Sequence, residues 1–450
     1  MKTKILSGVV VVLVIGLAAG AFWWLRRPQV ITFSDDSKVT LLAVEYGKRH
    51  AVPAAKAPAA STKARTPVRR GANSFTTTND TLVLWVRQEY DATQNQFHSF
   101  QYCVYDKAET ACKQTFGRNY GNGRQGSEIV AVQIDAFPRR QGKFIVRVQE
   151  QGNGGQEMSD QKFVIANPVR GPFANWTAEP LPATKSDDDL SVTLTKLVAG
   201  ADAPINRNQD NPDDAMNKGV QAVLHIERGG KPVANWEPVS VETSDATGND
   251  SRTIQIGQNG WQNGWANSSW QNGDDTFIYQ WGLWTDEPAW KIRLELSQQS
   301  GFSSDEQWTV QNIPLQPGRQ QDFYNSTRNK TNAVVAETDL NGVHLKIFPA
   351  KQFTDLPQNM PVQGGLTIQA DPALPDGMRM TLVSLTDDQT NDVGYWNNGT
   401  MTSTTGATTI TTYRYGLRDI SGVTNLNLTL AVHKSRFVEF TAKPEKAAAK

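Results

Sequence analysis

The sequence predicts an all-β protein: three tandem antiparallel β-sandwich domains, immunoglobulin-like or similar, after one N-terminal transmembrane helix. Three observations support this prediction. An apolar run fills the N-terminus, apolar and polar side chains alternate with a period of two over most of the remaining chain, and a similar order of strands recurs three times. Helical periodicity is nearly absent after residue 28, and the best helical candidate is the short piece Asp213–Lys218.

The N-terminal run extends from Ile5 to Leu25 without a charged residue, and two basic residues flank it on each side. A helix of this length spans about 31 Å, close to the thickness of a bilayer core. Trp23 and Trp24 at its end are typical of the headgroup region. We therefore expect residues 1–27 to form a signal anchor. The alternative is a signal peptide cut after Ala21, which would leave the mature protein secreted.

The orientation follows from the short N-terminal tail. Both flanks of the run are basic, so the positive-inside rule does not decide the orientation locally. The usual start of export signals favours an inner N-terminus, with residues 28 onward outside. The expected protein is a single-pass membrane protein whose C-terminal body is extracytoplasmic, in the periplasm or at the cell surface.

Charge is unevenly placed along a chain of 450 residues that is neutral overall. Residues 1–72 have a net charge of +9 and the remainder −9. The acidic body argues against nucleic acid as a partner. Residues 51–72 are rich in Ala, Pro, Lys and Arg without an acid, which predicts a flexible insertion in the first domain. This basic stretch is either a contact for anionic headgroups or a solvated linker.

Each predicted domain opens with one alternating strand and closes with a hairpin. The opening strands are Lys38–Tyr46, Leu190–Val198 and Val343–Phe348. The closing hairpins join Lys143–Gln149 to Gln161–Pro168, Trp290–Leu296 to Gln307–Pro314, and Leu426–Val432 to Arg436–Pro444. Repeats of this size match one antiparallel sandwich, so the predicted domains are 28–168, 185–316 and 333–444. The alternative is that any all-β chain contains such strands by chance.

Cys103 and Cys112 are the two cysteines of the chain. A hairpin with strands near 97–105 and 111–116 would bring them together, which makes them a disulfide candidate in an exported protein. The alternative is a pair of free thiols. Their spacing, without a histidine at ligand distance, does not fit a zinc site.

The segment Gly257–Asp275 alternates three tryptophans with Gln-Asn-Gly turns, and with the three that follow it, six of the 13 tryptophans lie within the 30 residues 261–290. Exposed tryptophan beside amides suits a sugar, because the ring stacks and the amides donate and accept hydrogen bonds. The candidate glycan-binding residues are Trp261, Asn263, Trp265, Trp270 and Asn272. The alternative is a long loop whose tryptophans pack against its own sandwich.

Acidic loops suggest a second kind of site. Asp210, Asp213 and Asp214 lie in one polar segment, where carboxylates between strands could gather around Ca²⁺. The spacing is not that of an EF-hand, and solvated loop acids are the alternative. Otherwise the sequence calls for no cofactor.

No recognised catalytic motif is present. The five histidines have no partner at the spacing of a metal or nucleophile constellation, and the sequence contains no G-x-S-x-G, H-E-x-x-H or phosphate-binding loop. The residues therefore identify no catalytic group. Whether the chain is an enzyme stays open, and a non-enzymatic role is favoured.

Three segments carry a resemblance: SDDSKVTLLAVEYGKRH after the run, EPAWKIRLELSQQSGFSSDEQWTVQNIP in the middle and SRFVEFTAKP at the end. They resemble uncharacterised bacterial envelope proteins that have an N-terminal export or anchor segment and tandem β-sandwich repeats. The resemblance covers most of the chain loosely and implies no activity or catalytic residue.

These observations predict a non-enzymatic, membrane-anchored extracytoplasmic binding or structural protein. Its partners would be the membrane, through the N-terminal helix, and a protein or a glycan. One alternative is a carbohydrate-binding or carbohydrate-active protein that uses the Trp-rich loop near acidic loops. For glycoside hydrolysis, such an enzyme would need two carboxylates facing each other across a cleft. A second alternative is a calcium-dependent adhesion module.

Overall fold

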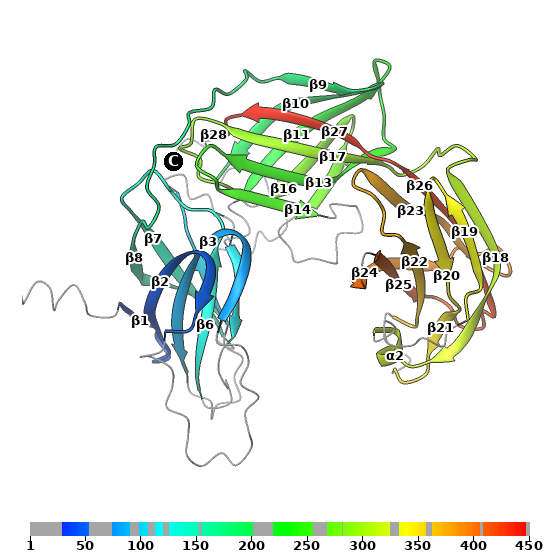
Figure 1. The fold of residues 1–450 in the computed structure, drawn as a ribbon, viewed down its shortest axis with the longest axis horizontal. Coiled ribbons are helices and arrows are strands. Elements are labelled where there is room, and N and C mark those ends of the chain that lie inside the picture. Colours follow the sequence, from blue (N-terminus) through cyan, green and yellow to red (C-terminus); the bar gives the residue numbers. More distant parts are fainter. Residues whose placement is uncertain are drawn as a thin grey trace, which may run out of the picture.

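The computed structural model consists almost wholly of antiparallel strands (Figure 1). It describes residues 29–53, 74–90, 99–106, 112, 114–119, 126–152, 155–200, 219–254, 268–280, 282–324, 333–356, 362–405 and 408–446. In these ranges the one helix is the short α2 (Gln320–Tyr324). The predicted all-β class is therefore confirmed.

The first group of strands forms two facing sheets. One sheet has the order β1-β2-β3-β6-β5 and the other β4-β7-β8. Their bounds are β1 (Val30–Thr32), β2 (Lys38–Ala51), β3 (Ser74–Glu89), β4 (Ser99–Cys103), β5 (Gln114–Asn119), β6 (Ser127–Ile134), β7 (Lys143–Gly152) and β8 (Gly155–Ala166). Alternate side chains are buried, as Phe144 and Val146 of β7 are, because successive residues of a strand point to opposite faces.

The second group also has two sheets, with the orders β15-β16-β11-β10-β28 and β14-β13-β17-β27. In the first of them β9 pairs with β10 and β12 with β11. The bounds are β9 (Ala183–Asp187), β10 (Leu190–Ala199), β11 (Val220–Arg228), β12 (Lys231–Pro232), β13 (Trp236–Asp245), β14 (Asp250–Ile254), β15 (Ser268–Asn272), β16 (Asp275–Gln280), β17 (Trp290–Gln298), β27 (Arg436–Ala442) and β28 (Glu445–Lys446).

The third group is a single path of hydrogen-bonded strands, β19-β20-β22-β21-β18-β26-β23, to which β25 and β24 are added at β22. The bounds are β18 (Gln307–Gly318), β19 (Ala336–Leu340), β20 (Val343–Ile347), β21 (Ala350–Phe353), β22 (Gly364–Asp371), β23 (Met378–Asp387), β24 (Gly394–Thr405), β25 (Thr408–Arg418) and β26 (Asn425–Lys434). Figure 1 shows the second group between the first and the third, so that the strands form an arch.

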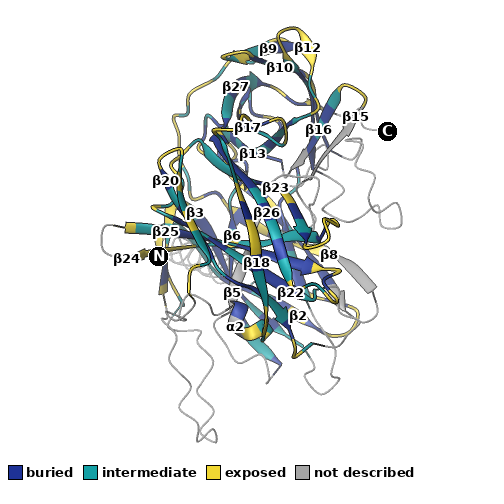
Figure 2. Cartoon of the chain, turned by 90° about the vertical axis from the view of Figure 1, so that its right-hand side faces the viewer, coloured by how far each residue is buried: buried dark blue, intermediate teal, exposed yellow. Residues whose placement is uncertain are grey.

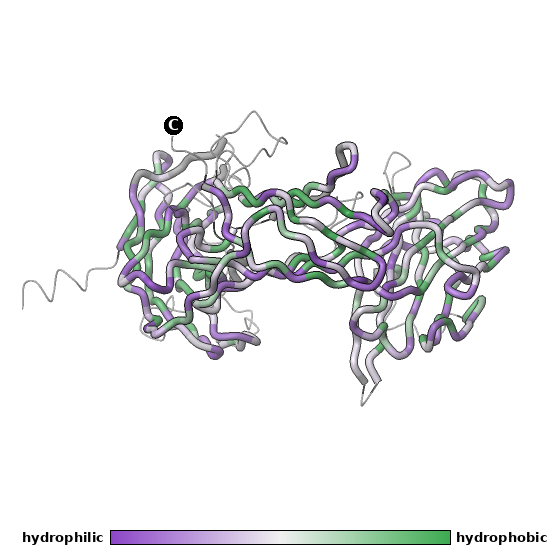
Figure 3. Tube along the Cα trace, turned by 90° about the horizontal axis from the view of Figure 1, so that it is seen from above, coloured by the Kyte–Doolittle hydropathy of each residue, from purple (hydrophilic) through white to green (hydrophobic). Residues whose placement is uncertain are grey.

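The buried apolar side chains follow this division only in part. One cluster extends from the first group into the second, from Ile31 to Trp290 and Phe440. A separate cluster fills the third group, for example with Leu345 and Leu428. Burial alternates along the strands in Figure 2, and hydropathy alternates along them in Figure 3. This alternation reflects the inward and outward faces of each sheet. The first two groups therefore share a continuous core.

Two of the three predicted closing hairpins are wrong. β7 pairs with β8 as expected, but β17 pairs with β27 and β18 pairs with β26. The chain leaves the second group after β17, builds the third group, and returns to add β27 beside β17. A period-two pattern identifies a strand but not its partner, which is why consecutive strands were assigned to each other. The division into three domains stays a prediction, and any such division has to place β27, from the end of the chain, in the second group.

The predicted opening strands lie in β2, β10 and β20. The N-terminal run, most of the insertion 51–72 and the helical candidate Asp213–Lys218 fall outside the described residues. Among the residues that are described, no helix has the length and apolar character to cross a membrane.

Phe440 of β27 is fully buried, and β27 pairs with β17 of the second group although it follows the third group in the sequence. Phe440→Ala should cost about 3–5 kcal/mol of unfolding free energy, because it empties part of the core around β17. Hydrogen exchange should then accelerate in β13 and β17 and stay unchanged in β18 and β23. The matched control Leu428→Ala, in β26, should give the opposite pattern. Faster exchange in β18 in the Phe440→Ala variant would contradict the observed pairing.

Candidate functional site

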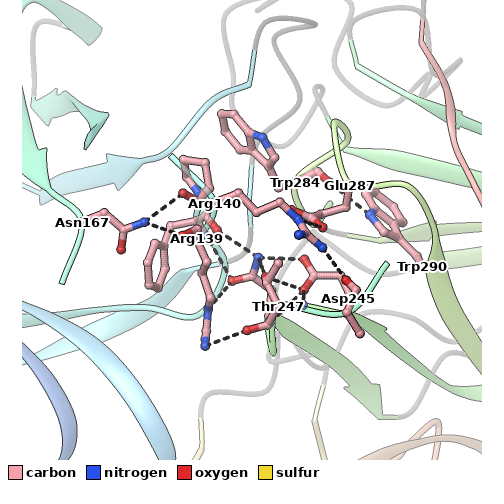
Figure 4. A network of polar contacts seen from close by, with 12 residues as sticks. Arg139, Arg140, Asn167, Asp245, Thr247, Trp284, Glu287 and Trp290 are labelled. Carbon is pink, nitrogen blue, oxygen red and sulfur yellow. Dashed lines mark hydrogen bonds and ion pairs between the residues drawn. The ribbon is translucent and has the colours of Figure 1, made fainter. Parts of the chain in front are cut away.

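A cluster of buried, hydrogen-bonded polar side chains lies where the first two groups of strands meet. It joins the β6–β7 loop, residues 135–142, to the β13–β14 turn and to the segment before β17 (Figure 4). Asn249 in the turn is fully buried. Its side-chain amide accepts from the Phe137 backbone N–H at 3.2 Å and donates to the Phe137 carbonyl at 2.9 Å. The asparagine thus pairs with the loop backbone as a strand would.

The turn that carries Asn249 is organised by Asp245, which is also buried. One carboxylate oxygen accepts from the Thr247 backbone N–H at 2.8 Å and from the Thr247 hydroxyl at 2.7 Å. The other accepts from Nδ2 of Asn249 at 2.8 Å. Gly248 has a φ of +91°, a conformation that favours glycine, and it leaves room for Arg139. The sequence Asp-Ala-Thr-Gly-Asn therefore folds as a tight Asx turn.

Arg139 approaches the same turn from the opposite group of strands. It is only 7% exposed, and its Nε donates to Oδ1 of Asn249 at 2.9 Å. Its Nη1 donates to the Tyr46 hydroxyl at 2.9 Å, and the guanidinium lies over the Phe137 ring. Arg139 and Asp245 are thus a buried cation and a buried anion joined through one amide. Buried charges are tolerated when their hydrogen bonds are satisfied in this way.

An ion pair closes the junction beside these groups. Nε of Arg140 donates to Glu287 at 2.9 Å, and Nη2 of Arg140 donates to the Ala174 carbonyl at 2.5 Å. The Glu287 side chain is 2% exposed. Burial raises the pKa of Glu287, against the opposing effect of the Arg140 guanidinium. Trp290 nearby is fully buried and donates from Nε1 to the Trp284 carbonyl.

Asn167, just after β8, holds the β6–β7 loop from behind. Its Nδ2 lies within hydrogen-bond distance of three loop carbonyls, those of Pro138, Arg139 and Gln141, at 2.6–3.1 Å. The loop that carries both arginines is thereby fixed by its own group of strands before it meets the next one.

An open pocket of about 320 Å³ lies beside this junction. It is lined by the arginine-bearing loop and by the segment after β8: Arg139, Arg140, Gln141, Gly142, Val169, Arg170, Gly171, Pro172 and Phe173. Two of its three arginines are already bonded within the junction, to Asn249 and to Glu287. We therefore interpret the pocket as the outer surface of the junction.

A second polar junction joins β17 of the second group to β23 and β26 of the third. Glu295 is buried and accepts from Nε of Arg379 at 2.7 Å, from Nη2 of the same residue and from the Ser435 hydroxyl at 2.7 Å. His433 lies 3.3 Å from the Ser297 hydroxyl and 3.2 Å from that of Thr381. Burial lowers the pKa of His433.

The structure leaves most of the sequence-predicted sites untested. Trp261, Asn263 and Trp265 of the glycan hypothesis, and Asp210, Asp213 and Asp214 of the calcium hypothesis, lie outside the described residues. Trp270 and Asn272 lie in β15, and only their backbone is described. Among the described side chains, no three or more His, Cys, Asp or Glu residues are grouped to hold a metal ion.

The two cysteines are buried and are free thiols in this structure. The hairpin expected to join them is wrong, because β4 pairs with β7 and β5 pairs with β6 in a different sheet. The backbone N–H of Cys112 nevertheless donates to the carbonyl of Val104, next to Cys103. Burial raises the pKa of the Cys112 thiol, with smaller contributions from Asp106, Asp245 and Cys103. The disulfide stays a prediction.

The sequence alone does not identify these junction residues as a site, because Arg139, Asp245 and Asn249 belong to no catalytic or binding motif. The local signal is the Asx-turn sequence that ends in Asn249, and it predicts a turn. It does not predict the partner of this turn, the β6–β7 loop, whose Arg139 is 108 residues from Thr247 in the sequence.

Removal of the bridging amide should destabilise the chain strongly. Asn249→Ala leaves the Phe137 backbone groups and the Arg139 side chain without their buried partner. Since each such group costs about 1–3 kcal/mol, we expect a loss of at least about 3 kcal/mol in urea unfolding. The matched control Asn235→Ala removes one hydrogen bond, to the Ser300 carbonyl, and should cost about 1 kcal/mol. Equal losses for the two variants would contradict the bridging role.

Glu287 should make stability depend on pH. Because the folded protein raises the pKa of this group, it retains a proton that the unfolded chain has already released. Through the interval between the ordinary and the raised pKa, the free energy of unfolding should fall as pH rises. Burial raises the pKa of Glu128 and Glu237 as well, and these two groups contribute a slope of the same sign. Glu287→Gln should therefore reduce the slope, whereas Glu179→Gln, in the partly exposed Lys185 pair, should leave it unchanged. An equal slope in the Glu287→Gln variant and the native chain would contradict the assignment.

Comparisons with known proteins assign no family. No family model matches the chain, and no curated protein matches it. Among solved structures, a protein in the glycosyl hydrolase family 38 from Enterococcus faecalis aligns with 82% of this chain at 9% identity and a TM-score of 0.11. The alignment covers 46% of that structure, less than half of its length. A similarity of this size supports no statement about fold or function.

Proposed function

We propose that the chain is a non-enzymatic structural protein of the cell envelope, tethered by its N-terminal run, whose β-sheets serve as a scaffold outside the cytoplasm. The proposal depends chiefly on the two polar junctions. At the first, Arg139, Asn249 and Asp245 are buried and bonded to one another across the joint. At the second, Glu295 is buried against Arg379 and Ser435.

Such joints favour a fixed orientation of neighbouring sheets. Opening either joint would expose buried charged groups and break several hydrogen bonds together, which carries a large free-energy cost. A domain pair that closes on a substrate works in the opposite way, because its interface has to separate easily. Fixed joints are what a spacer or a platform for a partner requires.

The tether follows from the sequence. The 21 uncharged residues from Ile5 to Leu25 are long enough to span a bilayer, and the described residues begin at Gln29, a few positions beyond. The sheets would therefore stand close to the outer surface of the membrane, with the second and third groups farther along the chain.

Membrane fractionation of the full chain in a bacterial host tests the proposal. The protein should stay in the carbonate-washed membrane, and protease added to spheroplasts should remove a C-terminal tag. Val12→Arg with Leu13→Arg should release the protein from the membrane, because each arginine at a helix centre costs about 2.5–3.5 kcal/mol on insertion. Ala18→Val keeps the run apolar and should change nothing. A tag protected from protease in intact spheroplasts would contradict the proposed orientation.

A further inference from the structure

The outer face of β7 and β8 combines exposed apolar and basic side chains. Ile145 on β7 and Val164 on β8 are opposite each other in the ladder, and they are 40% and 45% exposed. Opposed residues of antiparallel strands share a face, so these two side chains form one apolar spot. The intervening residues Phe144 and Phe163 point inward and are buried. The exposure of Ile145 and Val164 is therefore a property of this face and not of a frayed strand.

Positive charge surrounds this spot. Arg147 is opposite Lys162 on the same face, and Lys143 is opposite Ala166. The segments 143–147 and 161–166 contain these three cations and no carboxylate; the acids of the two strands, Glu150, Glu157 and Asp160, lie toward the other end of the ladder, and Glu150 is buried. The described body is acidic elsewhere, since the chain beyond residue 72 has a net charge of −9. A local excess of cations on an acidic body indicates a surface that meets an anionic partner.

The chain enters its folded part beside this same face. The side-chain amide of Gln29 donates to the Val164 carbonyl at 3.0 Å and accepts from the Val164 backbone N–H at 2.7 Å. The backbone N–H of Thr32 donates a further hydrogen bond to Oε1 of Gln161 at 3.3 Å. β1 pairs with β2 of the facing sheet and also contacts β8. Val30 on β1, at this edge, is a third exposed apolar side chain, 44% exposed. Figure 1 shows β1 beside β7 and β8 at one end of the molecule.

The position of Gln29 limits how far this face can be from the N-terminal run. Three residues separate Gln29 from Leu25, the last residue of that run, and the four Cα–Cα steps between the two span at most about 14 Å when fully extended. Electrostatic attraction between surface charges extends over about 8–10 Å at physiological salt. A tethered chain therefore holds these cations within reach of the headgroups.

We propose that this face, formed by Lys143, Ile145, Arg147, Lys162 and Val164 with Val30 beside them, rests on the anionic surface of the bilayer that holds the N-terminal run. The cations contact lipid phosphates, and the three apolar side chains enter the headgroup region. The inference depends on the proposed tether and adds to it a fixed orientation, in which the first group of strands lies against the membrane.

A quenching experiment on the full chain in lipid nanodiscs tests this orientation. Val164→Cys is labelled with a small fluorophore, and nitroxide-headgroup lipids serve as the quencher. The native Cys103 and Cys112 are buried and should not react. Val383→Cys on β23 is the matched control, since Val383 is an exposed valine of the third group. We expect quenching at residue 164 in discs of anionic lipid, weaker quenching in zwitterionic discs, and none at residue 383.

Charge reversal separates docking from mere proximity. Lys143→Glu with Lys162→Glu should abolish the quenching at residue 164 while the protein still copurifies with the discs. If residue 164 is no more quenched than residue 383 in a protein that copurifies with discs, the tether stands and the docking inference is wrong. If the protein does not copurify, both the tether and the inference fail. Shielding of the probe in detergent that grows with protein concentration would assign the face to a second copy of the chain and overturn the inference.

Discussion

The side-chain amide of Asn249 is the constraint on which the first half of the structure depends. Arg139 and Asp245 make no ion pair with each other, and each is bonded to this one group, the cation to its oxygen and the anion to its nitrogen. A carboxamide offers an acceptor and donors in one plane, whereas an aspartate at this position could satisfy only one of these two partners and a leucine neither. The Phe137 backbone uses the same amide. The relative placement of the first two groups of strands therefore depends on buried polar groups that meet at this one amide.

The second and third groups are joined in a different way. The chain crosses between them twice, from β17 to β18 and from β26 to β27. In the second group β17 pairs with β27, and in the third group β18 pairs with β26. Two antiparallel crossings restrict twisting and bending more than one linker does. The Glu295–Arg379 pair and the Ser435 hydroxyl lie at this crossing and fix it further. One linker connects the first two groups, and a larger set of buried polar contacts joins them. The backbone itself crosses twice between the second and third groups, and a smaller set of polar contacts is enough there.

The strands were predictable and their long-range partners were not. The alternation in Lys143–Gln149 or Trp290–Leu296 follows from one buried face, a property that neighbouring residues in the sequence already contain. The pairing of β17 with β27 depends on residues 140 or so positions apart, for which a single sequence holds no local signal. The same reason applies to the junction. The local sequence predicts the turn at Asp245, but the contact of this turn with Arg139 forms only in the tertiary structure. The Trp-rich and acidic segments remain predictions because their side chains lie outside the described part of the chain.

Burial acts in opposite directions on the pKa values of two ionisable groups at the two joints, and their partners differ accordingly. Burial disfavours the charged form of any group, so it raises the pKa of Glu287 at the first joint and lowers the pKa of His433 at the second. Near neutral pH the lowered pKa leaves His433 uncharged, and the neutral hydroxyls of Ser297 and Thr381 are adequate partners. Above its raised pKa a buried glutamate is charged, and it then needs a positively charged partner. This accounts for the arginine beside Glu287 and for the absence of an acidic hydrogen-bond partner at His433 among the contacts of the described residues.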